Sequence, residues 1–154
     1  MARKTISVVI GDLFAIPRTD GRFVLGQVLE EWMPGIISVA VFDFVLDTLS
    51  SPLPSGQNPP CAIAIQSVGK AEVSKGYWRM LGHSHLLADP KQSPHRTYAP
   101  SFIGAGWHSG KILENLVDAY YSLGTWEPYP GRPGFLKRLL LSENSKKLCG
   151  PGLH

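Results

Sequence analysis

Apolar and polar positions alternate on both sides of a tight turn near the start of the chain. The apolar segment 13–17 ends at Pro17, which cannot donate a backbone hydrogen bond to a sheet, and the Asp-Gly pair within residues 18–21 accepts positive φ at a reversal. Within residues 23–28 the side chains point alternately to the two faces of a second strand, and Gly26 marks a bulge or a close backbone approach. The pattern predicts a β-hairpin.

Three further segments have the composition of strands. Residues 36–44 and 62–68 are short, rich in β-branched residues and bounded by turn residues, and residues 77–81 form the expected last strand. Residues 51–60 contain four prolines together with serine and glycine. These prolines exclude a regular element, so we expect an exposed, extended loop there.

The clearest helical pattern lies in the second half of the chain. Ser109 is a suitable N-cap, the helix is expected to run to Leu123, and Gly124 is expected to end it in the left-handed conformation. A second, basic amphipathic helix is expected from residue 133 or 134 to Leu141, where we favour docking on the core over lying on a membrane. The first helix has an apolar stripe of Ile112, Leu113, Leu116, Val117 and Tyr120, whereas Lys111, Glu114, Asn115 and Asp118 lie mostly off it.

Strands followed by one or two helices predict an α+β fold, in which a curved antiparallel sheet packs against the C-terminal helices. By analogy, the opening hairpin is similar to the first hairpin of an SH3-like partial barrel. The length fits one domain of residues 1–154, with residues 130–154 as a basic C-terminal extension.

The net charge of +3 is concentrated in that extension. Residues 1–70 have a net charge of −1, residues 71–129 are balanced, and residues 130–154 have a net charge of +4. A nucleic-acid-binding module usually gathers basic groups on its folded face. The distribution therefore makes nucleic-acid binding unlikely and favours a solubilising terminal helix.

The cysteines and the apolar runs bear on the cellular compartment. Cys61 and Cys149 are far apart and form no C-x-x-C pair, which argues against a zinc site or a redox pair and suits a reducing cytoplasm. The first apolar run is broken by Gly11 and Asp12 and lacks a signal-peptidase site. No apolar run approaches the roughly 20 residues that span a bilayer. We therefore expect a cytoplasmic protein that does not bind membranes.

A metal site or a hydrolase remains an alternative. His83 and His85 would point to the same face of an extended segment, and a third metal ligand would have to come from His95, His108 or Asp89. Paired histidines in a polar loop are more often solvated, and no H-E-x-x-H motif is present. We expect no catalytic residue, cofactor or metal.

The tryptophans and a glycine-rich stretch favour structural roles. The glycine spacing in residues 104–110 fits neither a dinucleotide-binding loop nor a nucleophile elbow. We expect a flexible loop anchored by Trp107 before the helix. Each of the four tryptophans belongs to a different element and has apolar neighbours, which is typical of core filling: Trp32, Trp78, Trp107 and Trp126.

The opening hairpin also resembles the immunity protein 26 family, small bacterial proteins encoded beside polymorphic and contact-dependent toxins. The resemblance is carried by GD-x-FAIP-x-x-DGRF-x-x-G-x-V from Gly11 to Val28. Weaker similarities are the segments 39–44, 76–82 and 98–102. The resemblance covers about the first two-thirds of the chain and independently implies an α+β fold.

This resemblance implies an immunity protein, not an enzyme, that binds the C-terminal domain of a cognate toxin and blocks it sterically. Its oligomeric state would be a monomer or a weak dimer. The alternative is an SH3-like module that binds a small ligand or a nucleic acid. As partner-binding residues we expect exposed groups on loops, namely Trp32, Asp43, Asp47, His83 and His85, together with the proline-rich loop 51–60.

Overall fold

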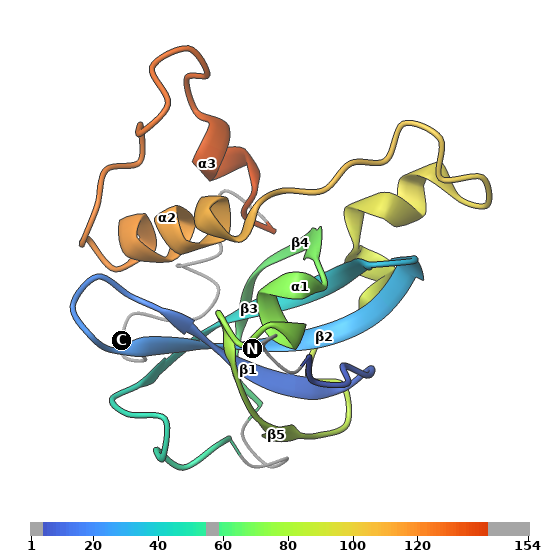
Figure 1. Cartoon of the computed structure of the whole chain (residues 1–154). Coiled ribbons are helices and arrows are strands. Elements are labelled where there is room, and N and C mark those ends of the chain that lie inside the picture. Colours follow the sequence, from blue (N-terminus) through green and yellow to red (C-terminus); the bar gives the residue numbers. More distant parts are fainter. Residues whose placement is uncertain (1–4, 55–58, 142–154) are drawn as a thin grey trace.

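The computed structural model describes residues 5–54 and 59–141, which form an open five-stranded antiparallel sheet with three short α-helices (Figure 1). The strands lie in the order β4-β3-β2-β1-β5. The elements are β1 (Asp12–Pro17), β2 (Phe23–Met33), β3 (Ile36–Leu46), β4 (Ala62–Gly69), α1 (Ala71–Ser74), β5 (Arg79–His83), α2 (Gly110–Tyr120) and α3 (Phe135–Arg138), with 3-10 turns at Pro90–Gln92 and Pro94–Tyr98. The predicted α+β class and curved sheet are confirmed. The partial-barrel analogy and the single-domain assignment stay predictions.

The predicted hairpin is formed by β1 and β2. Pro17 pairs with Phe23 across the turn, and Gly21 has a φ of 86°. Gly26 fulfils both predicted roles, because the β2–β3 register shifts beside it and the ring of Phe14 packs directly on its Cα. A methyl group at this position would overlap the Phe14 ring.

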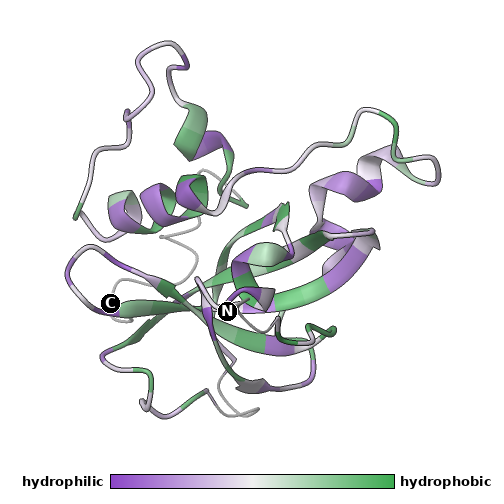
Figure 2. Ribbon diagram, in the orientation of Figure 1, coloured by the Kyte–Doolittle hydropathy of each residue, from purple (hydrophilic) through white to green (hydrophobic). Residues whose placement is uncertain are grey.

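The two faces of the sheet bury separate apolar clusters. On one face, α2, α3 and Trp78 cover side chains such as Phe14 and Val41. Figure 2 shows the apolar strands, and the hydrophilic residues of α2 turned away from them. The opposite face buries Leu25 and Phe42 under leucines of the segment that follows β5. Because successive side chains of a strand point to opposite faces of the sheet, the same strands contribute to two separate apolar cores.

The segment that follows β5 covers the second face without forming a helix or a strand. The buried amide of Gln27 in β2 donates to the carbonyl of His85 at 2.9 Å and accepts from the backbone N–H of Leu87 at 2.8 Å. Further along, the hydroxyls of Ser38 and Ser93 are 2.6 Å apart and buried. Two polar side chains inside the sheet thus hold residues 84–93 in place.

The segment before α2 and the segment after α3 hydrogen-bond to β4, which is an edge strand of the sheet. The backbone N–H of His108 donates to the carbonyl of Ser67 at 2.8 Å, just before α2 begins. The backbone N–H of Leu141, after α3, donates to the carbonyl of Ile63 at 2.9 Å. These bonds tie both ends of β4 to the helical part of the chain.

The helices α2 and α3 occur where they were predicted, with different ends. Gly124 was expected to terminate α2 in the left-handed conformation, but Ser122 does so, with a φ of 63°. The turn closes because Leu123 N–H donates to the carbonyl of Asp118 at 2.7 Å. Ser109 is the N-cap residue but makes no side-chain capping bond, and α3 is shorter than expected.

Asp118 was expected to lie off the apolar stripe of α2, yet it is buried. Its carboxylate accepts hydrogen bonds from the backbone N–H of Thr19 at 3.1 Å and from the Thr19 hydroxyl at 3.3 Å. The β1–β2 turn is therefore fastened to the far end of α2.

Among the described residues, no helix combines the length and apolar character needed to cross a membrane.

Some predictions fall partly outside the described residues. The proline-rich loop 51–60 is described except for residues 55–58, and the basic extension 130–154 is described only as far as Leu141.

The last strand, β5, begins and ends two residues later than the predicted range 77–81. Trp78 precedes it because its backbone N–H donates to the carbonyl of Glu72 at 2.8 Å.

Candidate partner-binding surface

An aromatic stack of Trp32, His95 and Phe102 lies where β2 meets the 3-10 turn Pro94–Tyr98. The Trp32 and His95 rings are parallel within 7°, with centroids 4.8 Å apart, and Phe102 tilts against both rings. The indole N–H of Trp32 donates to the Ser67 hydroxyl at 2.9 Å, which fixes the ring against β4. The stack joins the segment after β5 to the sheet.

The same stack contains a buried ionisable group. His95 is 2% exposed, and its Nε2 lies in close contact with Oε1 of Glu30. Arg96 binds both carboxylate oxygens of Glu30 at 2.9 Å. The Nδ1 of His95 has no hydrogen-bond partner among the described residues. Burial lowers the pKa of His95, although the Glu30 carboxylate opposes this shift.

Beyond the stack, residues 98–107 form a segment that we call the apolar loop. It projects beside the sheet, away from α3 (yellow to gold in Figure 1). Three large side chains of this loop are exposed: Tyr98 by 44%, Ile103 by 82% and Trp107 by 53%. Trp107 was predicted to anchor the loop, and this prediction is wrong. The side chain that anchors it is Phe102, through the aromatic stack.

The other tryptophans differ in burial. Trp78 fills the core as predicted, with its ring stacked on Phe14 at a centroid distance of 5.3 Å. Its indole N–H donates to Glu114 at 3.0 Å. Trp32 and Trp126 are only partly buried, so the core-filling prediction fails for Trp107 and holds fully for Trp78.

Asp43 was expected to be an exposed group on a loop, but it is buried within β3. Its carboxylate accepts hydrogen bonds from the hydroxyls of Tyr120 at 3.0 Å and Tyr121 at 2.5 Å. Burial raises the pKa of both phenols, and the Asp43 charge raises it further, so both remain donors at neutral pH. Asp43 therefore connects β3 to the end of α2.

The remaining predicted contact residues do not form one surface: Asp47, His83 and His85 are exposed, whereas Trp32 is partly buried. Asp47 follows β3 and lies 3.4 Å from Arg22, close to the hairpin turn. Trp32 lies near the opposite end of β2. His83 ends β5, where its Nδ1 is 3.0 Å from Oδ1 of Asp12, and His85 is exposed nearby in the chain.

The alternative metal site is not assembled in the part of the chain that is described. Within residues 5–54 and 59–141, no three side chains of histidine, cysteine, aspartate or glutamate come together as metal ligands. His95 is in the aromatic stack, whereas the ring of His108 lies edge-on to Phe135. Burial lowers the pKa of His108, as does the nearby Arg132.

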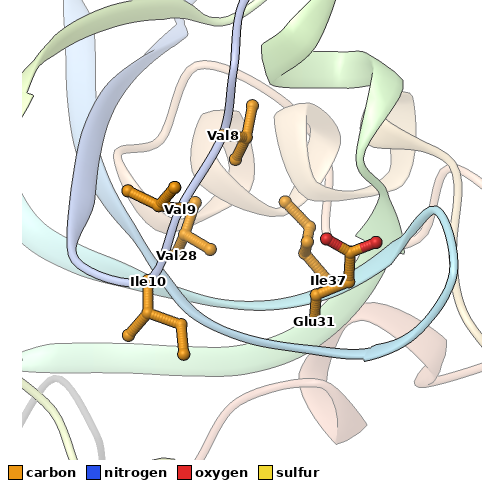
Figure 3. Close-up of a pocket in the computed structure, with 6 residues that line it drawn as sticks. All are labelled: Val8, Val9, Ile10, Val28, Glu31 and Ile37. Atoms are coloured by element: carbon orange, nitrogen blue, oxygen red, sulfur yellow. The ribbon is translucent and has the colours of Figure 1, made fainter.

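A second apolar surface surrounds an open hollow of about 420 Å³ (Figure 3). In the figure, Val8, Val9 and Ile10 line one side, and Ile37 and Glu31 line the other. The Glu31 carboxylate accepts from the backbone N–H of Gly35 at 3.0 Å, and this bond lowers the pKa of Glu31. Lys70 lies 3.0 Å from the same carboxylate. Among the described residues that line the hollow, Glu31 is the charged one, and its carboxylate is therefore already paired.

Sequence comparison identifies one matching family. The model of immunity protein 26 matches residues 9–111, which include the whole sheet, the aromatic stack and the apolar loop. No curated protein and no solved structure is significantly similar to the chain.

Proposed function

Because this chain belongs to the immunity protein 26 family, we propose that it protects a bacterial cell by binding a cognate toxin domain in the cytoplasm. The family identity is the observation that carries the proposal. The partner is the C-terminal domain of a polymorphic or contact-dependent toxin, and binding occludes the active site of the toxin. The protein acts by surface complementarity and catalyses no reaction.

The surface of the fold supports binding. Exposed apolar side chains occur in the apolar loop and around the hollow of Val8 to Ile10. Exposed apolar clusters commonly mark protein-protein contacts. Toxin–immunity pairs of the colicin type are among the tightest known complexes, and standard-size interfaces of about 1,600 Å² can reach such affinity.

The decisive experiment is co-expression with a candidate toxin domain, chosen from the genes that neighbour this one. Cells that produce this toxin domain should die without the protein and survive with it, while an unrelated toxin domain should still kill. In solution, toxin activity should fall linearly and reach zero at one equivalent of the protein. Toxicity that persists at full expression of both proteins would refute the proposal.

A further inference from the structure

The end of β5 carries an imidazole that a buried carboxylate holds in place. Nδ1 of His83 lies 3.0 Å from Oδ1 of Asp12, and the Asp12 side chain is 8% exposed, whereas that of His83 is 59% exposed. We propose that Nε2 of His83 is a hydrogen-bond acceptor that binds a lysine or arginine side chain of the toxin, and that Asp12 fixes it in this role. This inference rests on the proposed function and names one contact of its interface.

Asp12 determines which nitrogen of the ring carries the proton. Its Oδ2 accepts a hydrogen bond from the backbone N–H of Val9 at 2.8 Å. A carboxylate can only accept, so Nδ1 of His83 is the protonated nitrogen that faces Oδ1. Nε2 has no hydrogen-bond partner among the described residues, and in the neutral ring it has a free lone pair. The fold therefore presents an acceptor at this point of the surface.

The backbone of Gly11 restrains the same ring. Gly11 has a φ of 96°, and a Cβ there would lie 2.8 Å from Cε1 of His83 and 2.5 Å from the carbonyl oxygen of Ser84. The backbone N–H of Ser84 donates to the carbonyl of Gly11 at 3.1 Å, which keeps the two segments together. An imidazole that is already restrained loses little conformational entropy when a partner binds it.

The charge behind the ring indicates which donor fits. Within residues 5–54 and 59–141, no lysine or arginine forms an ion pair with Asp12, so the buried carboxylate and the neutral imidazole together have one negative charge. A carboxylate that accepts from one nitrogen of a histidine makes the other nitrogen more basic. Charge-assisted hydrogen bonds are roughly twice as strong as neutral ones. A cationic N–H donor therefore fits this acceptor better than a hydroxyl group, and a carboxylate of the partner would be repelled.

The substitution Asp12→Asn reverses the role of Nε2 and keeps the shape of the side chain. Because the Val9 N–H can only donate, the amide oxygen of the new side chain has to face it, and the amide NH2 then faces His83. Nδ1 becomes the acceptor, the ring proton moves to Nε2, and the lone pair that would receive an N–H of the toxin is lost. The exposed His85, two residues further along the chain, supplies the matched control.

The first measurement needs only this protein. Nitrogen-15 NMR at about pH 8, above the ordinary histidine pKa of about 6.5, should show the ring of His83 protonated at Nδ1 in the wild type and at Nε2 in Asp12→Asn. Dispersed amide signals in the same samples would show that the variants are folded. A wild-type ring that is protonated at Nε2, alone or together with Nδ1, would overturn the proposal.

The second measurement is the affinity for the toxin domain that the protein neutralises in co-expression. His83→Ala and Asp12→Asn should each weaken binding by about 10-fold or more, and His85→Ala by less than about 3-fold. Added salt should weaken binding of the wild type more than binding of Asp12→Asn, because the variant lacks the charge of the carboxylate.

The outcomes separate the two proposals. If the wild-type protein neither protects cells nor binds a toxin domain, the proposed function fails. If it binds, and His83→Ala and Asp12→Asn bind equally well, the contact at His83 is wrong and the proposed function stands. Stoichiometric binding of Zn²⁺ to the purified protein, lost in His83→Ala, would replace the cationic donor with a metal ion.

Discussion

The indole of Trp32 lies parallel to the imidazole of His95, with ring centroids 4.8 Å apart. One ring comes from the end of β2 and the other from the segment that leads into the apolar loop. The contact therefore couples the position of the loop to the charge of one histidine. Glu30 and Arg96 are the charged groups that face this histidine, and Asp89 interacts with Arg96.

We expect acid to weaken this contact. Because the pKa of His95 is lowered in the fold, the unfolded chain binds the proton more readily below the ordinary histidine pKa of about 6.5. Stability should be fully present above that pH and should fall as the pH decreases below it, because the folded protein takes up the proton less readily than the unfolded chain. Thermal unfolding at a series of pH values would measure this loss.

The variant His95→Phe keeps a ring in the stack and removes the titration. It should reduce the loss of stability in acid, while the exposed His85→Asn should leave the loss unchanged. A residual slope in His95→Phe is expected from His108, whose pKa is also lowered. Identical pH profiles for wild type and His95→Phe would contradict this account.

Gly26→Ala should destabilise the protein, because its methyl group would enter the space of the Phe14 ring. Overpacking in a core typically costs about 1–3 kcal/mol, and Phe14 is itself stacked on Trp78. Gly69→Ala, where no atom lies within 4 Å of the new methyl group, is the matched control. Urea unfolding of both variants would decide, and equal midpoints would refute the close approach.

Tyr121→Phe should lower the free energy of unfolding by about 1.5–3 kcal/mol. The substitution removes a hydrogen bond to the buried carboxylate of Asp43, and bonds to charged groups are worth more than neutral ones. Tyr98→Phe, at a 44% exposed position, should change stability by less than about 0.5 kcal/mol. Chemical denaturation measures both effects, and equal losses would indicate that the Asp43 contact contributes nothing.

Asp118→Ala should loosen the hairpin turn while α2 remains folded. The backbone N–H of Thr19 would lose its acceptor and should exchange with solvent at least about 10-fold faster, which corresponds to about 1.4 kcal/mol. Hydrogen exchange followed by NMR can resolve this single amide. Protection at Thr19 that equals wild type would show that the side chain of Asp118 does not hold the turn.

Strands β3 and β4 were predictable because burial on both faces of the sheet produces short, nearly continuous runs rich in β-branched residues between turn residues. The predictions 36–44 and 62–68 begin where β3 and β4 begin and end within two residues of their ends. Local turn chemistry located the hairpin equally well. The family resemblance, carried by the same hairpin, is confirmed by the match over residues 9–111.

The candidate surface could not be predicted because it depends on contacts between distant residues. A carboxylate near a strand end, such as Asp43, looks solvated until Tyr120 and Tyr121 are brought to it from α2. Similarly, Trp107 resembles an anchor in the sequence, and only the fold shows that Phe102 takes that role. A glycine-rich segment has no periodicity that would distinguish inward from outward side chains.

The closure of β4 bears on self-association of the free protein. An exposed edge strand offers unpaired backbone groups to other chains and so promotes aggregation and fibril growth. Here His108 and Leu141 occupy acceptors near both ends of that edge, at Ser67 and Ile63. Under the proposed function the protein has to accumulate before its toxin arrives, and these two bonds hinder pairing of one copy's β4 edge with another copy.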